Sequence, residues 1–94
     1  MPSLAEAVSS ERLAVRRGAV EAYAWMGPAG APGLIGGLND PAPEVRRAAA
    51  RGLGRLGPEV AASEPALLRA VNDPDRHVRE TAAAALKRIG AGSP

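Results

Sequence analysis

Cysteine and phenylalanine are absent from this sequence, and aromatic side chains are almost absent. The 94 residues contain no Cys, no Phe, one Trp, one Tyr and one His. Without Cys there is neither a disulfide framework nor a thiolate site, and a lone His argues against a transition-metal site. No apolar run approaches the ~20 residues that span a membrane, and Met1-Pro2-Ser3 does not begin a signal peptide. We therefore expect a single cytoplasmic domain over residues 1–94 that needs no cofactor.

Basic residues only slightly outnumber acidic ones. Twelve basic residues stand against ten acidic ones, which gives a net charge of +2. The sequence pI is nevertheless near 9.9, because Lys87 is the only Lys and arginines do not titrate below pH 12. An excess this small does not by itself indicate a nucleic-acid partner.

One sequence pattern occurs three times, over residues 4–27, 34–57 and 67–90. The copies begin 30 and then 33 residues apart. Identical residues recur in register, for example at Val15/Val45/Val78, Arg16/Arg46/Arg79 and Gly27/Gly57/Gly90. A period of this length is typical of stacked repeat units rather than of one wrapped core.

Each copy reads as a short helix, a tight turn and a longer helix. In the second copy, Val45, Ala49, Leu53 and Leu56 fall on one helical face. Glycine followed by proline at 57–58 predicts the end of that helix. The pattern predicts six helices, no strand, and connecting loops at residues 28–33 and 58–64.

Local signals mark two helix starts and a close approach of two helices. Ser3 with Glu6 matches a capping box, and Ser63 is a plausible N-cap for the third copy. Gly52 and Gly54 interrupt the second long helix, which indicates either close helix packing or a ligand near the backbone.

The repeated pattern resembles HEAT-like repeats, of the short variety found in phycobilisome-lyase-type proteins. The resemblance rests on Leu38-Asn-Asp40-Pro followed by Val45-Arg46, and on the equivalent residues from Val71 to Gly90. It implies an α-solenoid of three stacked helix–turn–helix units, over about residues 3–27, 32–57 and 65–90. It also implies a structural ladder of turn aspartates and arginines between units, here Arg16, Asp40, Arg46, Asp73 and Arg79. In the first copy Ser10 stands where Asp is expected, so its rung is either absent or replaced by Glu11.

The face opposite the core gives the candidate partner-binding residues. In HEAT-like proteins the second helices of the units line one groove, so these side chains would share a surface. They are Arg17, Glu21, Trp25, Arg47, Arg51, Arg55, His77 and Arg88. Trp25 either contacts a partner beside Arg55 or folds over the open N-terminal end of the stack. We expect Val15, Ala19, Tyr23 and Met26 to face inward.

We interpret the chain as a non-catalytic protein–protein interaction module, because no nucleophile, base and acid can be brought together. Nucleic-acid binding through the arginine stripe is the alternative, although Glu21, Glu44 and Glu80 on the same face oppose it. A role as a bilin-lyase subunit rests on the family resemblance alone. The exposed end faces of the stack also allow a homodimer.

Overall fold

Every regular element of the described chain is helical. The computed structural model describes residues 3–8 and 10–90. Its α-helices are α1 (Leu4–Val8), α2 (Leu13–Trp25), α3 (Ala31–Gly37), α4 (Pro43–Leu56), α5 (Glu64–Ala70) and α6 (Arg76–Gly90). Two 3-10 helices, η1 (Gly27–Gly30) and η2 (Gly57–Ser63), precede α3 and α5. The all-α prediction is confirmed. Five of the α-helices have at least seven residues, whereas α1 has five, and none is long and apolar enough to cross a membrane.

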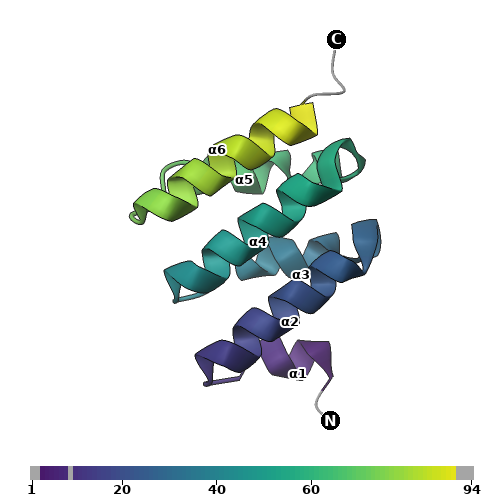
Figure 1. The fold of residues 1–94 in the computed structure, drawn as a ribbon, viewed down its shortest axis with the longest axis vertical. Coiled ribbons are helices and arrows are strands. Elements are labelled where there is room, and N and C mark those ends of the chain that lie inside the picture. The colour runs from purple at the N-terminus through teal and green to yellow at the C-terminus, as the bar shows by residue number, and fades with distance from the viewer. Residues whose placement is uncertain (1–2, 9, 91–94) are drawn as a thin grey trace.

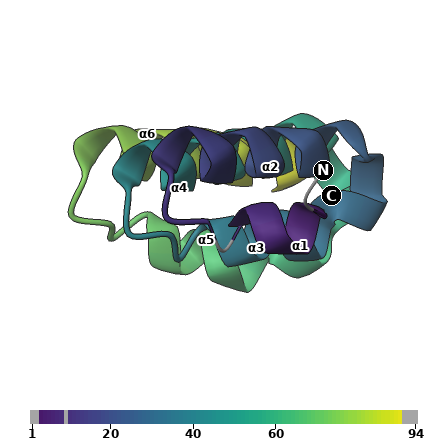
Figure 2. The ribbon, with the colours of Figure 1, turned by 90° about the horizontal axis from the view of Figure 1, so that it is seen from below.

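The helices lie in two layers. The long helices α2, α4 and α6 lie side by side in one layer, and α1, α3 and α5 form the other (Figures 1 and 2). Each short helix packs against the long helix that follows it along the chain, and α4 packs against both α2 and α6. The middle helix α4 therefore shares one boundary with each of the other long helices.

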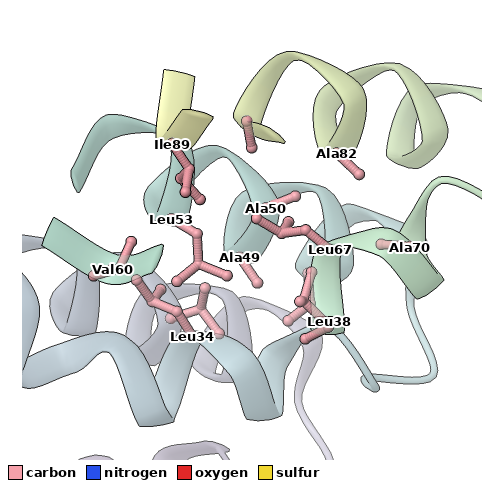
Figure 3. Close-up of a cluster of buried hydrophobic side chains, with 14 residues drawn as sticks. Leu34, Leu38, Ala49, Ala50, Leu53, Val60, Leu67, Ala70, Ala82 and Ile89 are labelled. Carbon is pink, nitrogen blue, oxygen red and sulfur yellow. The ribbon is translucent and has the colours of Figure 1, made fainter. Parts of the chain in front are cut away.

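The core lies between the two layers and is built almost entirely from aliphatic side chains. Leu34 and Leu67 from the short helices and Val45, Leu53 and Val78 from the long ones are fully buried. Figure 3 shows the leucines surrounded by small side chains from neighbouring helices. Because these residues recur at equivalent repeat positions, the period of the sequence predicts the core.

Met26 is an exception to the predicted inward face. Its side chain is 49% exposed, whereas its repeat equivalents Leu56 and Ile89 pack into the core. Ile89 belongs to α6, which packs against η2. The same η2 also packs against α4, the helix that ends at Leu56, whereas α2 packs against the shorter η1.

The segments predicted as loops are instead largely helical. Residues 27–30 and 57–63 form η1 and η2, and α3 and α5 begin directly after them. Gly27 and Gly57 have φ angles of 72° and 65°, which only glycine adopts freely, and they mark the predicted ends of α2 and α4. Proline follows each of them in the first turn of a 3-10 helix, where a missing N–H costs nothing.

The two predicted N-caps differ in outcome. The Glu6 N–H donates to Ser3 Oγ at 3.1 Å, and the Ser3 hydroxyl also lies 3.2 Å from Glu6 Oε1. Ser63 precedes α5, but its side chain makes no capping hydrogen bond, and its buried Oγ has no hydrogen-bond partner among the described residues. The capping prediction for Ser63 is wrong because its φ and ψ of −80° and −8° are helical, whereas a capping residue needs an extended backbone.

The glycines of α4 allow close packing of the long helices. A Cβ atom on Gly54 would lie 3.0 Å from the Cα atom of Ala85 in α6. A Cβ atom on Gly52 would lie 3.1 Å from the Cβ atom of Ala24 in α2. Of the two interpretations of these glycines, the structure supports close packing.

Gly54→Val is expected to lower the free energy of unfolding by about 2 kcal/mol, because α4 and α6 must separate to admit the new side chain. Gly18→Ala in α2 is the matched control, since nothing lies within 4 Å of the added Cβ atom. It should raise the free energy of unfolding by about 0.5–1 kcal/mol. Urea unfolding measures both, and an unchanged Gly54→Val protein would contradict the packing argument.

Candidate functional site

One ion pair connects α2, and a second connects α4, to the turn of the next helical pair. Arg16 Nε lies 2.9 Å from Asp40 Oδ2, and Arg46 Nε lies 2.8 Å from Asp73 Oδ2. In each pair the Nη2 atom donates to the other carboxylate oxygen, so the contact is bidentate. The arginine side chains are 15% exposed and the aspartates 8% and 9%, so water screens these pairs only weakly.

The same arginines also bind the turn that precedes their own helix. Arg46 Nη1 donates to the carbonyl oxygens of Asp40 and Pro41, at 2.8 and 3.0 Å. Arg16 Nη1 donates to the carbonyls of Ser10 and Glu11 in the same geometry. One guanidinium thus holds the turn ahead of its helix together and attaches it to the following turn.

The first copy lacks the turn aspartate yet keeps the turn. Ser10 Oγ accepts a hydrogen bond from the Arg12 N–H at 3.1 Å, as Asp40 Oδ1 accepts one from the Ala42 N–H at 2.9 Å. Glu11 contributes its carbonyl to Arg16, not its carboxylate. Replacement of the missing aspartate by Glu11 is therefore wrong. Each rung runs from an arginine to the aspartate of the following turn.

Arg79 makes the same contacts to turn carbonyls as Arg16 and Arg46 do. Its Nη1 donates to the carbonyls of Asp73 and Pro74 at 2.9 and 3.0 Å. Within residues 3–8 and 10–90, no carboxylate lies within ion-pair distance of its guanidinium.

These contacts lower the pKa of the Asp73 carboxyl group. Burial raises the pKa of its carboxyl, but hydrogen bonds from the Arg46 guanidinium and the Asp75 N–H lower it. The positive charges of Arg46 and Arg79 lower it further, and the net result is a pKa below the ordinary value. Folding therefore favours the charged form of Asp73.

A pocket with a volume of about 560 Å³ lies between α2 and α4 on their outer surface, and we name it the α2–α4 groove. Six of the candidate partner-binding residues line it, namely Arg17, Glu21, Trp25, Arg47, Arg51 and Arg55. Small residues between these long side chains, Ala24, Ala48 and Gly52, also line the groove. Its volume lies within the range usual for ligand pockets.

Trp25 is the most exposed large apolar side chain of the described chain, at 83%. The guanidinium carbon of Arg55 lies 6.0 Å from the centre of its ring, within the range of a cation–π contact. A ring with this exposure covers little of the protein, which argues against Trp25 as a lid over the end of the stack.

The charges of the groove are unevenly paired. Arg17 Nε lies 3.1 Å from Glu21 Oε1 within α2. Among the residues that the structure describes, Arg47, Arg51 and Arg55 have no carboxylate within 4.0 Å. They lie one helical turn apart on α4, and Glu44 at the start of the same helix is the remaining acidic residue in the lining. The α4 side of the groove is consequently positive.

His77 and Arg88 lie outside this groove, contrary to the expectation of one shared surface. Both are exposed on α6, on the far side of α4. Ala84 occupies in α6 the repeat position of Arg51, so α6 lacks one of the long side chains that line the groove beside α4. Sequence reasoning also missed the small residues of the lining, although their alternation with arginines along α4 was a usable signal.

The groove offers cationic and aromatic surface rather than reactive groups. In residues 3–8 and 10–90, no three His, Asp or Glu side chains gather as a metal site. Guanidinium groups bind carboxylates and phosphates, and an exposed indole binds apolar or flat groups.

Two comparisons with known proteins bear on this arrangement. A family model described as HEAT repeats matches residues 31–94, more than half of the chain. The match is to HEAT repeats in general and does not specify the phycobilisome-lyase type. A search of the curated proteins found no match.

Asp73→Asn is expected to lower the free energy of unfolding by about 2 kcal/mol at pH 7, because it leaves the Arg46 guanidinium without its carboxylate. The folded pKa is depressed, so the contribution of Asp73 is complete above its unfolded pKa of about 3.9 and disappears as the pH falls through the folded value. Chemical denaturation of both proteins should therefore show a gap that closes on acidification.

Glu80→Gln is the control for this prediction, because it removes an ion pair whose N–O distance is 3.1 Å but whose side chains are 79% and 59% exposed. Its effect should stay below about 0.5 kcal/mol. A gap between wild type and Asp73→Asn that persists unchanged in acid would refute the assignment of a depressed pKa to Asp73.

Proposed function

We propose, since this chain belongs to the family of HEAT-repeat proteins, that it is a non-catalytic scaffold that binds a protein partner in the α2–α4 groove. HEAT repeats are generally protein-interaction scaffolds, and stacked repeats present extended binding surfaces. In this proposal the chain is a short α-solenoid of three units, over about residues 3–27, 32–57 and 65–90, with the short repeat period of the phycobilisome-lyase type.

The observation that carries the proposal is the exposure of Trp25 beside Arg55. An indole exposed to 83% contributes little to the core, so packing does not account for its position. Trp and Arg are the residues most enriched among those that dominate binding energy at protein interfaces. Both line a groove of about 560 Å³, which partly encloses whatever binds there.

The repeat alignment supports a role specific to this position. Trp25, Arg55 and Arg88 are equivalent in the three copies, so the stack itself requires no tryptophan there. Only the first two of these side chains lie in the groove. The position at which tryptophan replaces arginine therefore lies in the α2–α4 groove.

The double variant Trp25→Ala/Arg55→Ala should lose partner binding while its far-UV circular dichroism stays unchanged. We would select peptides from a random phage-displayed library on the wild-type chain and measure their affinity by fluorescence anisotropy. The selected peptides should bind the double variant at least about tenfold more weakly, the loss expected of an interface hot spot.

Arg88→Ala is the matched control, because it removes an exposed arginine at the same repeat position outside the groove. It should leave the affinity unchanged. Equal binding of the selected peptides to wild type and double variant would overturn the groove as the partner site. Loss of helicity in the double variant would show that the pair is structural.

Nucleic-acid binding is the second candidate function, favoured by three arginines one turn apart on α4 that form no ion pair with the described residues. The acidic residues Glu21 and Glu44 in the same lining oppose a polyanion. We expect no binding of labelled single-stranded or duplex DNA at micromolar protein and low salt, where phosphate contacts are strongest. Fluorescence titration measures it, and a saturable curve under these conditions would favour nucleic acid over a protein partner.

A further inference from the structure

We infer that the α2–α4 groove binds an extended peptide segment that carries carboxylates at alternate positions and an apolar side chain beside them. This inference rests on the proposed function and adds the chemistry of the partner. It follows from the unpaired charges of α4, from their spacing and from the position of Trp25.

The arginines of α4 are complementary in charge to an acidic partner. The described part of the chain holds four ion pairs, and none involves Arg47, Arg51 or Arg55. By contrast, Arg16, Arg46 and Arg17 meet carboxylates of this chain. Three adjacent guanidinium groups without carboxylates repel one another, and acidic side chains of a partner would relieve that repulsion.

The spacing of these arginines matches the side-chain spacing of an extended peptide. Residues 47, 51 and 55 follow one another at intervals of four on α4, and one such interval rises about 6 Å along the helix axis. In an extended chain, side chains on the same face recur every second residue, at about 6.6 Å. A strand with carboxylates at alternate positions therefore meets each arginine in turn.

The two ends of the groove differ in chemistry, and one of them is aromatic. Arg55 lies over the Trp25 ring at 6.0 Å, and Leu56 lines the same pocket. At the opposite end of α4, Glu44 provides an acidic group. The groove is thus polarised, so an apolar residue fits at the Trp25 end and an acidic residue is disfavoured near Glu44.

The same acidic residues favour a peptide over a nucleic acid. A nucleic-acid strand carries a phosphate at every nucleotide and cannot avoid Glu21 and Glu44, whereas a peptide places its carboxylates selectively. Three arginines on one helix also make too few phosphate contacts for strong non-specific binding.

The test uses three fluorescein-labelled peptides and the full chain. The first peptide has three glutamates at alternate positions, serines between them and a leucine at each end. The second has glutamine in place of each glutamate, and the third has the same composition as the first with its glutamates adjacent. We expect the first peptide to bind at least about tenfold more tightly than the second and several-fold more tightly than the third, with an affinity that falls as salt increases.

Protein variants locate the binding. Arg51→Gln and Arg55→Gln should each weaken binding of the first peptide about fivefold, the upper end for an exposed ion pair. Arg88→Gln, outside the groove, should have no effect. The peptide series alone keeps the inference testable if an arginine variant fails to fold.

Equal binding of the glutamate and glutamine peptides would overturn this inference. If neutral peptides selected by display still required Trp25, the proposed function would stand without the acidic partner. If labelled oligothymidine bound more tightly than the acidic peptide and required the same arginines, a nucleic acid would replace the peptide as the occupant.

Discussion

The bidentate contact between an arginine of one long helix and the aspartate of the next turn is the interaction on which the rest of the structure depends. Each guanidinium of Arg16 and Arg46 binds two carbonyls of the turn ahead of its helix and one carboxylate beyond it. A largely covered ion pair is favourable only when its remaining polar atoms are also satisfied, and these arrangements meet that condition. The contacts therefore set how far each turn lies from its neighbour along the stack.

The ladder acts together with small residues where the long helices meet. Gly52 and Gly54 bring α4 close to α2 and α6, and a Cβ atom at either position would crowd its neighbour. The ladder fixes the turns, and α2 and α4 are in contact with each other. Together these contacts fix the position of α4 relative to α2. That position places Trp25 beside Arg55 and leaves small residues in the lining of the groove between them.

The repeat allows much of the fold to be predicted from the sequence. The fully buried Leu34 and Val45 recur in the third copy as Leu67 and Val78, which are buried to the same extent. The 3-10 helices were missed because proline and glycine after a helix indicate a turn equally well. The groove was predicted only in part, because the extent of a pocket depends on which neighbouring side chains are long. His77 and Arg88 carry the same pattern as the groove residues but lie on α6, where Ala84 replaces an arginine.

A double-mutant cycle on Arg16 and Asp40 tests most directly whether the ladder holds the stack together. This rung joins α2 to the turn that precedes α4, through atoms 2.9 Å apart, and these two long helices line the groove. The free energy of unfolding would be measured for wild type, Arg16→Gln, Asp40→Asn and the double variant. If the ladder holds the stack together, we expect a coupling energy of about 1–2 kcal/mol between the two positions. A coupling within about 0.3 kcal/mol of zero would contradict it, because the two substitutions would then act independently.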